Sequence, residues 1–211
     1  HYPEGQRLEN VIGVDRFNAL TAALATYNMP GEFISTMKPW AAMMTLSTPP
    51  PVTGFFMDLS LSLRASGSGL KVIGLETLEQ QLSFLENMPV DMQLSLLDQA
   101  IVEFRQVGEI HDEMVNSYLA GDLQQIHKLS LEQLKEVGKT ASDYFMRAGI
   151  DERNHRMLQT LLEHLQTNTV FVAVGALHLP GKEGLVNLLR QRGFDLEPLG
   201  MPVPTPAAET D

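Results

Sequence analysis

The feature that most constrains the fold of this chain is the apolar run TVFVAV at residues 169–174. It is rich in β-branched residues, which favour extended backbone. A continuous apolar run of this length is typical of a strand that is buried on both faces. The run therefore predicts a β-sheet that is covered by helices.

Two further segments are predicted to be strands, residues 70–75 (LKVIGL) and residues 194–199 (FDLEPL). A helix is expected between the last two strands, over residues 182–192, and Gly193 follows it. A strand, a helix and a second strand in this order favour parallel pairing with a right-handed crossover. Residues 169–199 are thus expected to form a compact βαβ-like unit.

Most of the remaining chain has the spacing of amphipathic helices, with apolar residues every three or four positions. Helices are predicted over residues 15–27, from Pro39 to before Pro49, and over 54–66, 77–88 and 91–120, with further helices before residue 169. The expected fold class is α+β, mostly helical, with a small and partly parallel sheet whose carboxyl ends carry the site. Residues 1–199 are predicted to form one domain, and the proline-rich residues 200–211 a disordered tail.

The composition excludes several classes of function. The net charge is −11, from 26 acidic and 15 basic side chains, whereas nucleic-acid binding needs a basic face. The chain has no cysteine, so it contains no disulfide, zinc ribbon or catalytic thiol. No run of eighteen apolar residues is present, so no segment is expected to span a membrane.

Two of the predicted strands run into glycine and then a polar residue, Glu76 in Gly74-Leu75-Glu76 and His178 in Gly175-Ala176-Leu177-His178. Ligands of open α/β sheets lie beyond the carboxyl ends of the strands. A carboxylate and an imidazole at one such edge suit a divalent cation such as zinc, manganese or cobalt, or general acid–base catalysis. The alternative is structural: a glutamate is favourable at a helix start, a histidine can bond a turn, and a catalytic metal usually needs three protein ligands.

The segment DERNHRM at residues 151–157 supplies Arg153, His155 and Arg156. An arginine suits a carboxylate or a developing oxyanion. The alternative is that these residues form a solvated helix start. His111, His127 and His164 lie on amphipathic helices without a partner at metal-ligand spacing, and are interpreted as surface residues.

The segment VFVAVGALHLPGKEGLVNLLRQRGFDLEPL, together with MKPWAAMMTLS, GLKVIGLETLEQQLSFLENMP and DERNHRM, resembles the TraB/GumN family. That family is similar to the Tiki membrane-associated peptidases and to erythromycin-esterase-like and ChaN-like proteins. Its members carry two Gly-x-x-His motifs, a glutamate and an arginine. The resemblance assigns these roles to His178, Glu76 and Arg153. It implies a metal-dependent hydrolase of amide or peptide bonds, with His178 as a ligand of Mn, Co or Zn, Glu76 as a second ligand or as the general base that activates water, and Arg153 as the oxyanion stabiliser.

The first Gly-x-x-His is not found in this sequence. The opening segment HYPEGQRLENVIG resembles the region that follows that motif in family members. The resemblance therefore implies an upstream segment with that motif and the first strands of the sheet, and metal binding by residues 1–211 alone is expected to be weak. Family members commonly carry an export signal, which implies a periplasmic or cell-envelope location. The rival hypothesis is a non-enzymatic envelope protein that binds a small ligand or peptide in the same crevice.

Overall fold

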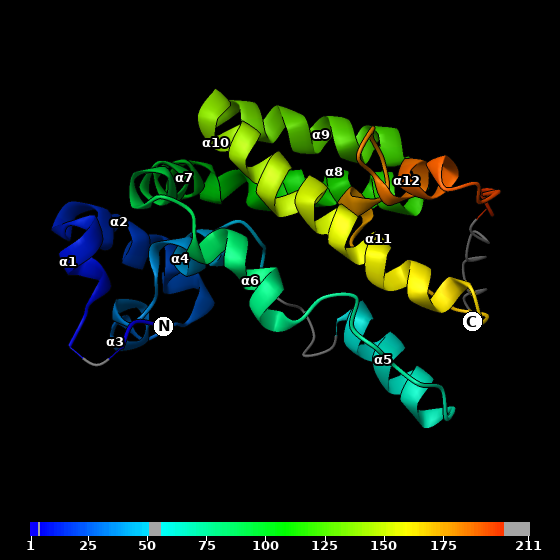
Figure 1. The fold of residues 1–211 in the computed structure, drawn as a ribbon. Helices are drawn as coiled ribbons and strands as arrows, with labels where there is room; N and C mark the ends of the chain where they lie inside the picture. The colour runs from blue at the N-terminus through cyan, green and yellow to red at the C-terminus, as the bar shows by residue number, and fades with distance from the viewer. Residues whose placement is uncertain (4, 51–55, 201–211) are drawn as a thin grey trace, which may run out of the picture.

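The structure, a computed structural model, describes residues 1–3, 5–50 and 56–200, and over these residues the chain is helical (Figure 1). The α-helices in chain order are α1 (Leu8–Ile12), α2 (Val14–Leu24), α3 (Gly31–Ser35), α4 (Pro39–Leu46), α5 (Met57–Gly67), α6 (Leu78–Glu86), α7 (Val90–Glu103), α8 (Val107–Leu119), α9 (Leu123–Glu136), α10 (Lys139–Tyr144), α11 (Glu152–Leu165) and α12 (Leu185–Gln191). Shorter turns are η1 (Ala25–Tyr27), η2 (Phe104–Gln106) and η4 (Ala176–His178), and η3 (Phe145–Asp151) is a π-helix. No described helix is both long enough and apolar enough to cross a membrane.

The larger hydrophobic core joins the N-terminal helices to α7. Leu20 and Leu24 of α2, Leu46 of α4 and Leu97 of α7 are almost completely buried in it. α4 packs mainly against α7, and Pro39 begins α4 at a position where a proline loses no helical hydrogen bond. The helices α1 to α4 and α7, which supply most of this core, lie together on one side of the molecule (Figure 1).

A smaller core lies in the other half, where α11 crosses the body of the molecule and packs against α12 (Figure 1). Met157 and Leu158 of α11 contact Leu185 and Leu188 of α12 in this core. Leu75 and Val174 pack against it from two segments far apart in the sequence. The smaller core therefore brings together the three stretches in which site residues are predicted.

The prediction of an α+β fold is wrong, because no strand is present among the described residues. Segments 70–75, 169–174 and 194–199 have no strand ladder, so residues 1–3, 5–50 and 56–200 contain no parallel sheet, no βαβ unit and no site at strand ends. A strand needs a neighbour for its backbone N–H and C=O groups, and neither 70–75 nor 169–174 has one within the described part of the chain. Phe171 is 80% exposed, which also contradicts a strand buried on both faces.

The helix predicted over residues 91–120 is also different, since η2 interrupts it between α7 and α8. The predicted helix over residues 15–27 is observed as α2 followed by η1. α5 begins at Met57, and the first residues of the helix predicted over 54–66 lie outside the described part. The predicted tail lies outside it from residue 201 onward, so its disorder and the domain limits stay predictions.

Candidate functional site

Glu76 is presented by a tight bend immediately before α6. A side chain on Gly74 would place its Cβ 2.8 Å from the backbone oxygen of Glu76, so this bend requires glycine at position 74. Thr77 caps α6 in a capping box with Gln80, and the Thr160 hydroxyl of α11 donates to the backbone oxygen of Leu75 at 3.2 Å. The bend is thus fixed on both sides, and the Glu76 side chain is only 7% exposed.

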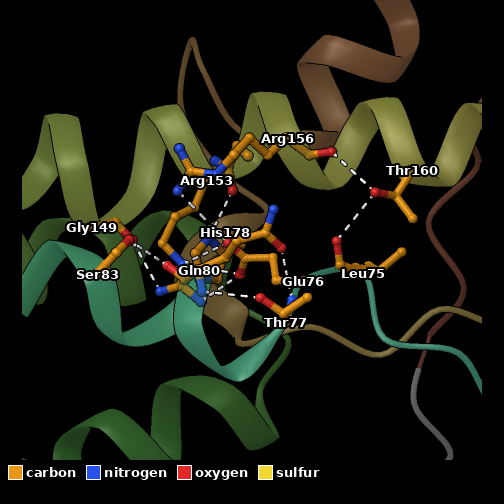
Figure 2. Close-up of polar contacts among 11 residues, drawn as sticks. Leu75, Glu76, Thr77, Gln80, Ser83, Gly149, Arg153, Arg156, Thr160 and His178 are labelled. Atoms are coloured by element: carbon orange, nitrogen blue, oxygen red, sulfur yellow. Dashed lines mark hydrogen bonds and ion pairs between the residues drawn. The ribbon is translucent and has the colours of Figure 1, made fainter.

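Arg153, in the first turn of α11, forms hydrogen bonds and an ion pair with the Glu76 carboxylate (Figure 2). Its Nη2 donates to Oε2 at 2.8 Å, and its Nε donates to Oε2 at 3.0 Å and to Oε1 at 3.2 Å. The remaining Nη1 donates to the backbone oxygen of Gly149 in the π-helix η3. With 12% of the Arg153 side chain exposed, the two residues form a buried ion pair through Nε and Nη2, and Gly149 accepts from the third guanidinium nitrogen.

Arg156 lies one helical turn further along α11 and adds a second positive charge. Its Nη2 is 3.8 Å from Oε1 of Glu76, and 40% of its side chain is exposed. Its Nε is buried and has no hydrogen-bond partner among the described residues. The Glu76 carboxylate is therefore surrounded by two guanidinium groups, of which Arg156 is the more accessible.

His178 ends η4 and lies beside the Glu76–Arg153 pair (Figure 2). The residue is 8% exposed, and its Nδ1 is 2.7 Å from Oδ1 of Asn154 in α11. Burial of the ring, and then the positive charge of Arg153, lower the pKa of His178 to about 4, against a smaller opposing effect of Glu76. The imidazole is consequently neutral at neutral pH, as a metal ligand or a general base must be.

The structure thus brings the three predicted site residues together, although their chemical roles stay predictions. The remaining candidates lie elsewhere or at the rim. His155 is exposed and pairs with Glu183, Nε2 to Oε2 at 2.8 Å. His111 and His164 are half-buried on α8 and α11 and make no side-chain hydrogen bond among the described residues.

Asn154 is the residue of this site that the sequence analysis missed. It is completely buried and also donates from Nδ2 to the backbone oxygen of Glu183 at 2.8 Å. The signal was its position, because it shares the buried face of α11 with Met157, Leu158 and Leu161. A polar residue on an apolar helical stripe needs a buried hydrogen-bond partner, which makes it a candidate for a site.

The metal that the resemblance implies fits His178 but not the whole residue set. Both oxygens of Glu76 are bonded to Arg153, and a cation at the carboxylate would meet the positive guanidinium. Among the described residues no group of three or more His, Cys, Asp or Glu side chains is arranged to hold a metal ion. The described residues therefore supply one ready histidine ligand, not a complete catalytic centre.

Residues 1–198 match the profile of the TraB/PrgY/gumN family. The chain is 26% identical over 171 residues to "Metalloprotease TIKI1" of Danio rerio, covering 70% of this chain and 35% of that protein. It is 25% identical over 164 residues to "Metalloprotease TIKI homolog" of Nematostella vectensis, covering 67% and 35%. It is 25% identical over 177 residues to "Metalloprotease TIKI2" of Xenopus tropicalis, covering 73% and 33%.

The chain spans about a third of the length of these curated relatives. No solved structure matches the chain at a significant level.

Proposed function

Because the chain belongs to the TraB/PrgY/gumN family, we propose that it contributes to a metal-dependent peptidase in which His178 is a metal ligand. The relatives named as metalloproteases support the reaction class, at about a quarter sequence identity. The observation that carries the proposal is the placement of His178, a buried imidazole whose Nδ1 lies 2.7 Å from Oδ1 of Asn154 and whose ring lies beside the Glu76–Arg153 pair. The metal supplies the activation of water when it is bound.

Glu76 and Arg153 have a different part in this proposal from the one expected of them. The carboxylate orients the Arg153 guanidinium beside His178 through the hydrogen bonds from Nε and Nη2. Nη1 and Nη2 of Arg153 each donate one of their two N–H groups to Gly149 or Glu76, so a role of Arg153 in oxyanion stabilisation falls to the second N–H of either nitrogen. Arg156, which is more exposed, is the guanidinium that a substrate carbonyl or carboxylate can reach without breaking that pair.

The substrate of such an enzyme is a peptide, and we propose that it binds beside Arg156 and His178. A periplasmic or cell-envelope location, where the family's export signals would place it, belongs to the same proposal. Manganese, cobalt and zinc are the candidate metals, since all three accept imidazole nitrogen.

The test of the proposal is metal-dependent cleavage by the 211-residue chain. Purified protein is incubated with a fluorogenic peptide library and each of the three metals, before and after chelation. Cleavage that requires metal and is lost in His178→Ala supports the proposal. His111→Ala is the matched control, because it also removes an imidazole that is not fully exposed, but from α8. Cleavage that His178→Ala retains would contradict it.

One observation favours the rival function, a non-enzymatic binding protein. Both oxygens of the Glu76 carboxylate accept hydrogen bonds from Arg153, so the carboxylate is not free to act as a general base in this conformation. A binding protein would use Arg156 to hold a peptide without cutting it. Saturable binding of library peptides that depends on Arg156, with no cleavage under any metal condition, would decide for the rival.

A further inference from the structure

The Asn154 side chain is the most completely buried polar group of the site. It is 0% exposed and lies on the face of α11 that carries Met157, Leu158 and Leu161. A buried amide is costly unless its donors and its acceptor find partners. Asn154 has partners at both ends, the backbone oxygen of Glu183 and the ring of His178.

These two partners fix the orientation of the amide. The backbone oxygen of Glu183 can only accept a hydrogen bond, so the Asn154 atom that faces it at 2.8 Å is the NH2 group. The opposite orientation would set two oxygens against each other. The atom that faces Nδ1 of His178 at 2.7 Å is consequently Oδ1.

The orientation of the amide determines which nitrogen of His178 carries the proton. Oδ1 of Asn154 has no hydrogen to donate, so Nδ1 of the histidine is the donor. A neutral imidazole carries one N–H, which leaves Nε2 with a free lone pair. Nε2 makes no hydrogen bond with any residue that the structure describes.

We propose that Asn154 is a positioning residue that holds His178 as its Nδ1–H tautomer and so reserves Nε2 for a metal ion, an inference that rests on the proposed function. Histidine ligands generally donate their second N–H to an acceptor that sets the tautomer and the ring orientation. The same amide ties the backbone at Glu183 to α11, so one side chain fixes both the ring and the loop that follows η4.

The test uses the metal-free 211-residue chain labelled with 13C and 15N in its histidines. Ring nitrogen and Cδ2 chemical shifts of His178, at a pH where the ring is neutral, report the tautomer directly. The expected result for the wild type is Nδ1–H. An Nε2–H tautomer would overturn the inference, and this arm does not depend on the folding of any variant.

Asn154→Leu removes the acceptor and is expected to release His178 into a mixture of tautomers and to weaken metal binding by roughly 10–100-fold. Glu183→Ala is the control, because it removes the exposed His155–Glu183 contact but keeps the backbone oxygen that Asn154 uses. It is expected to retain Nδ1–H. A folded Asn154→Leu variant that retains Nδ1–H, or a Glu183→Ala variant that loses it, would overturn the inference.

The two proposals fail in different ways in this experiment. An Nε2–H tautomer with metal uptake that still depends on His178 refutes the role of Asn154 alone. An Nδ1–H tautomer without any metal uptake refutes the proposed function, and with it the purpose of the reserved lone pair.

Discussion

Removal of the Glu76 charge is the perturbation that tests the architecture of the site most sharply. Glu76→Gln keeps the size and shape of the side chain but leaves Arg153 with its positive charge, 12% exposed, facing a neutral amide. The guanidinium loses three hydrogen bonds of 2.8–3.2 Å to an ionised acceptor. Arg156 loses the carboxylate 3.8 Å away as well.

The magnitude follows from the burial of the pair. Breaking a buried ion pair by removal of one partner generally costs about 3–5 kcal/mol, because the other charge stays buried and uncompensated. For a chain of this size each kcal/mol lowers the melting temperature by about 2–4 °C, so a decrease of roughly 6–20 °C is expected. The double variant Glu76→Gln/Arg153→Gln is expected to recover part of this loss, since it leaves no isolated charge.

The assay is thermal and urea unfolding followed by circular dichroism, with Glu32→Gln as the matched control. Glu32 pairs with Arg7 at 2.7 Å, but their side chains are 77% and 41% exposed. An exposed pair of this kind contributes about 0–1 kcal/mol. If Glu76→Gln and Glu32→Gln destabilise the chain equally, the claim of a buried, energetically coupled pair is refuted.

Three further predictions concern other parts of the chain. Leu97→Ala, at a fully buried position of α7, is expected to lower the free energy of unfolding by about 2–5 kcal/mol. Its control is Leu119→Ala on α8, where the leucine is 61% exposed, and this variant should change the free energy of unfolding by no more than about 0.5 kcal/mol. Equal urea midpoints for the two variants would contradict the assigned core. Thr77→Ala removes the capping box of α6 and is expected to cost about 1 kcal/mol, and an unchanged urea midpoint would show that the cap contributes nothing. Because the pKa of His178 is lowered to about 4 in the folded chain, from the 6.5 of an unperturbed histidine, the unfolded chain binds a proton at His178 first as the pH falls. This histidine should therefore leave the free energy of unfolding unaffected above pH 6.5 and reduce it by about 3 kcal/mol as the pH falls to 4. Urea unfolding of the wild type and of His178→Ala across this range should show the extra loss of stability in the wild type alone. Parallel stability curves for the two proteins would contradict the low pKa.

Local signals in the sequence predicted the helices well. Pro39 begins α4, and the apolar spacing of residues 15–27 is found in α2 and η1. The break at η2 could not be read in this way, since Phe104 and Val107 continue the apolar spacing through the turn. Periodicity reports which face is apolar, and it does not report where a turn tightens from α to 3₁₀.

The strands were mispredicted for a non-local reason. Residues 169–174 have the β-branched composition of a strand, but a strand exists only where another strand supplies hydrogen bonds. In the described chain this segment contacts the smaller core through Val174 and leaves Phe171 exposed. Composition alone does not contain the identity of the partner.

The sequence predicted which residues lie in the candidate site, but it did not predict the hydrogen bonds between them. Glu76, Arg153 and His178 lie together, yet the sequence could not reveal that Arg153 occupies both carboxylate oxygens from 77 positions away. It also gave no direct indication that Asn154 bonds the ring of His178. Both contacts depend on the packing of α11 against the bends before α6 and after η4, which no local pattern describes.

The most direct test of the central claim is metal uptake by His178. The wild-type chain, His178→Ala and His111→Ala are each dialysed to equilibrium against increasing Mn²⁺, Co²⁺ and Zn²⁺, and bound metal is measured by mass spectrometry. We expect weak but saturable metal uptake by the wild type and by His111→Ala, and loss of that metal uptake in His178→Ala. Uptake curves that are the same for the wild type and His178→Ala at every concentration would contradict it.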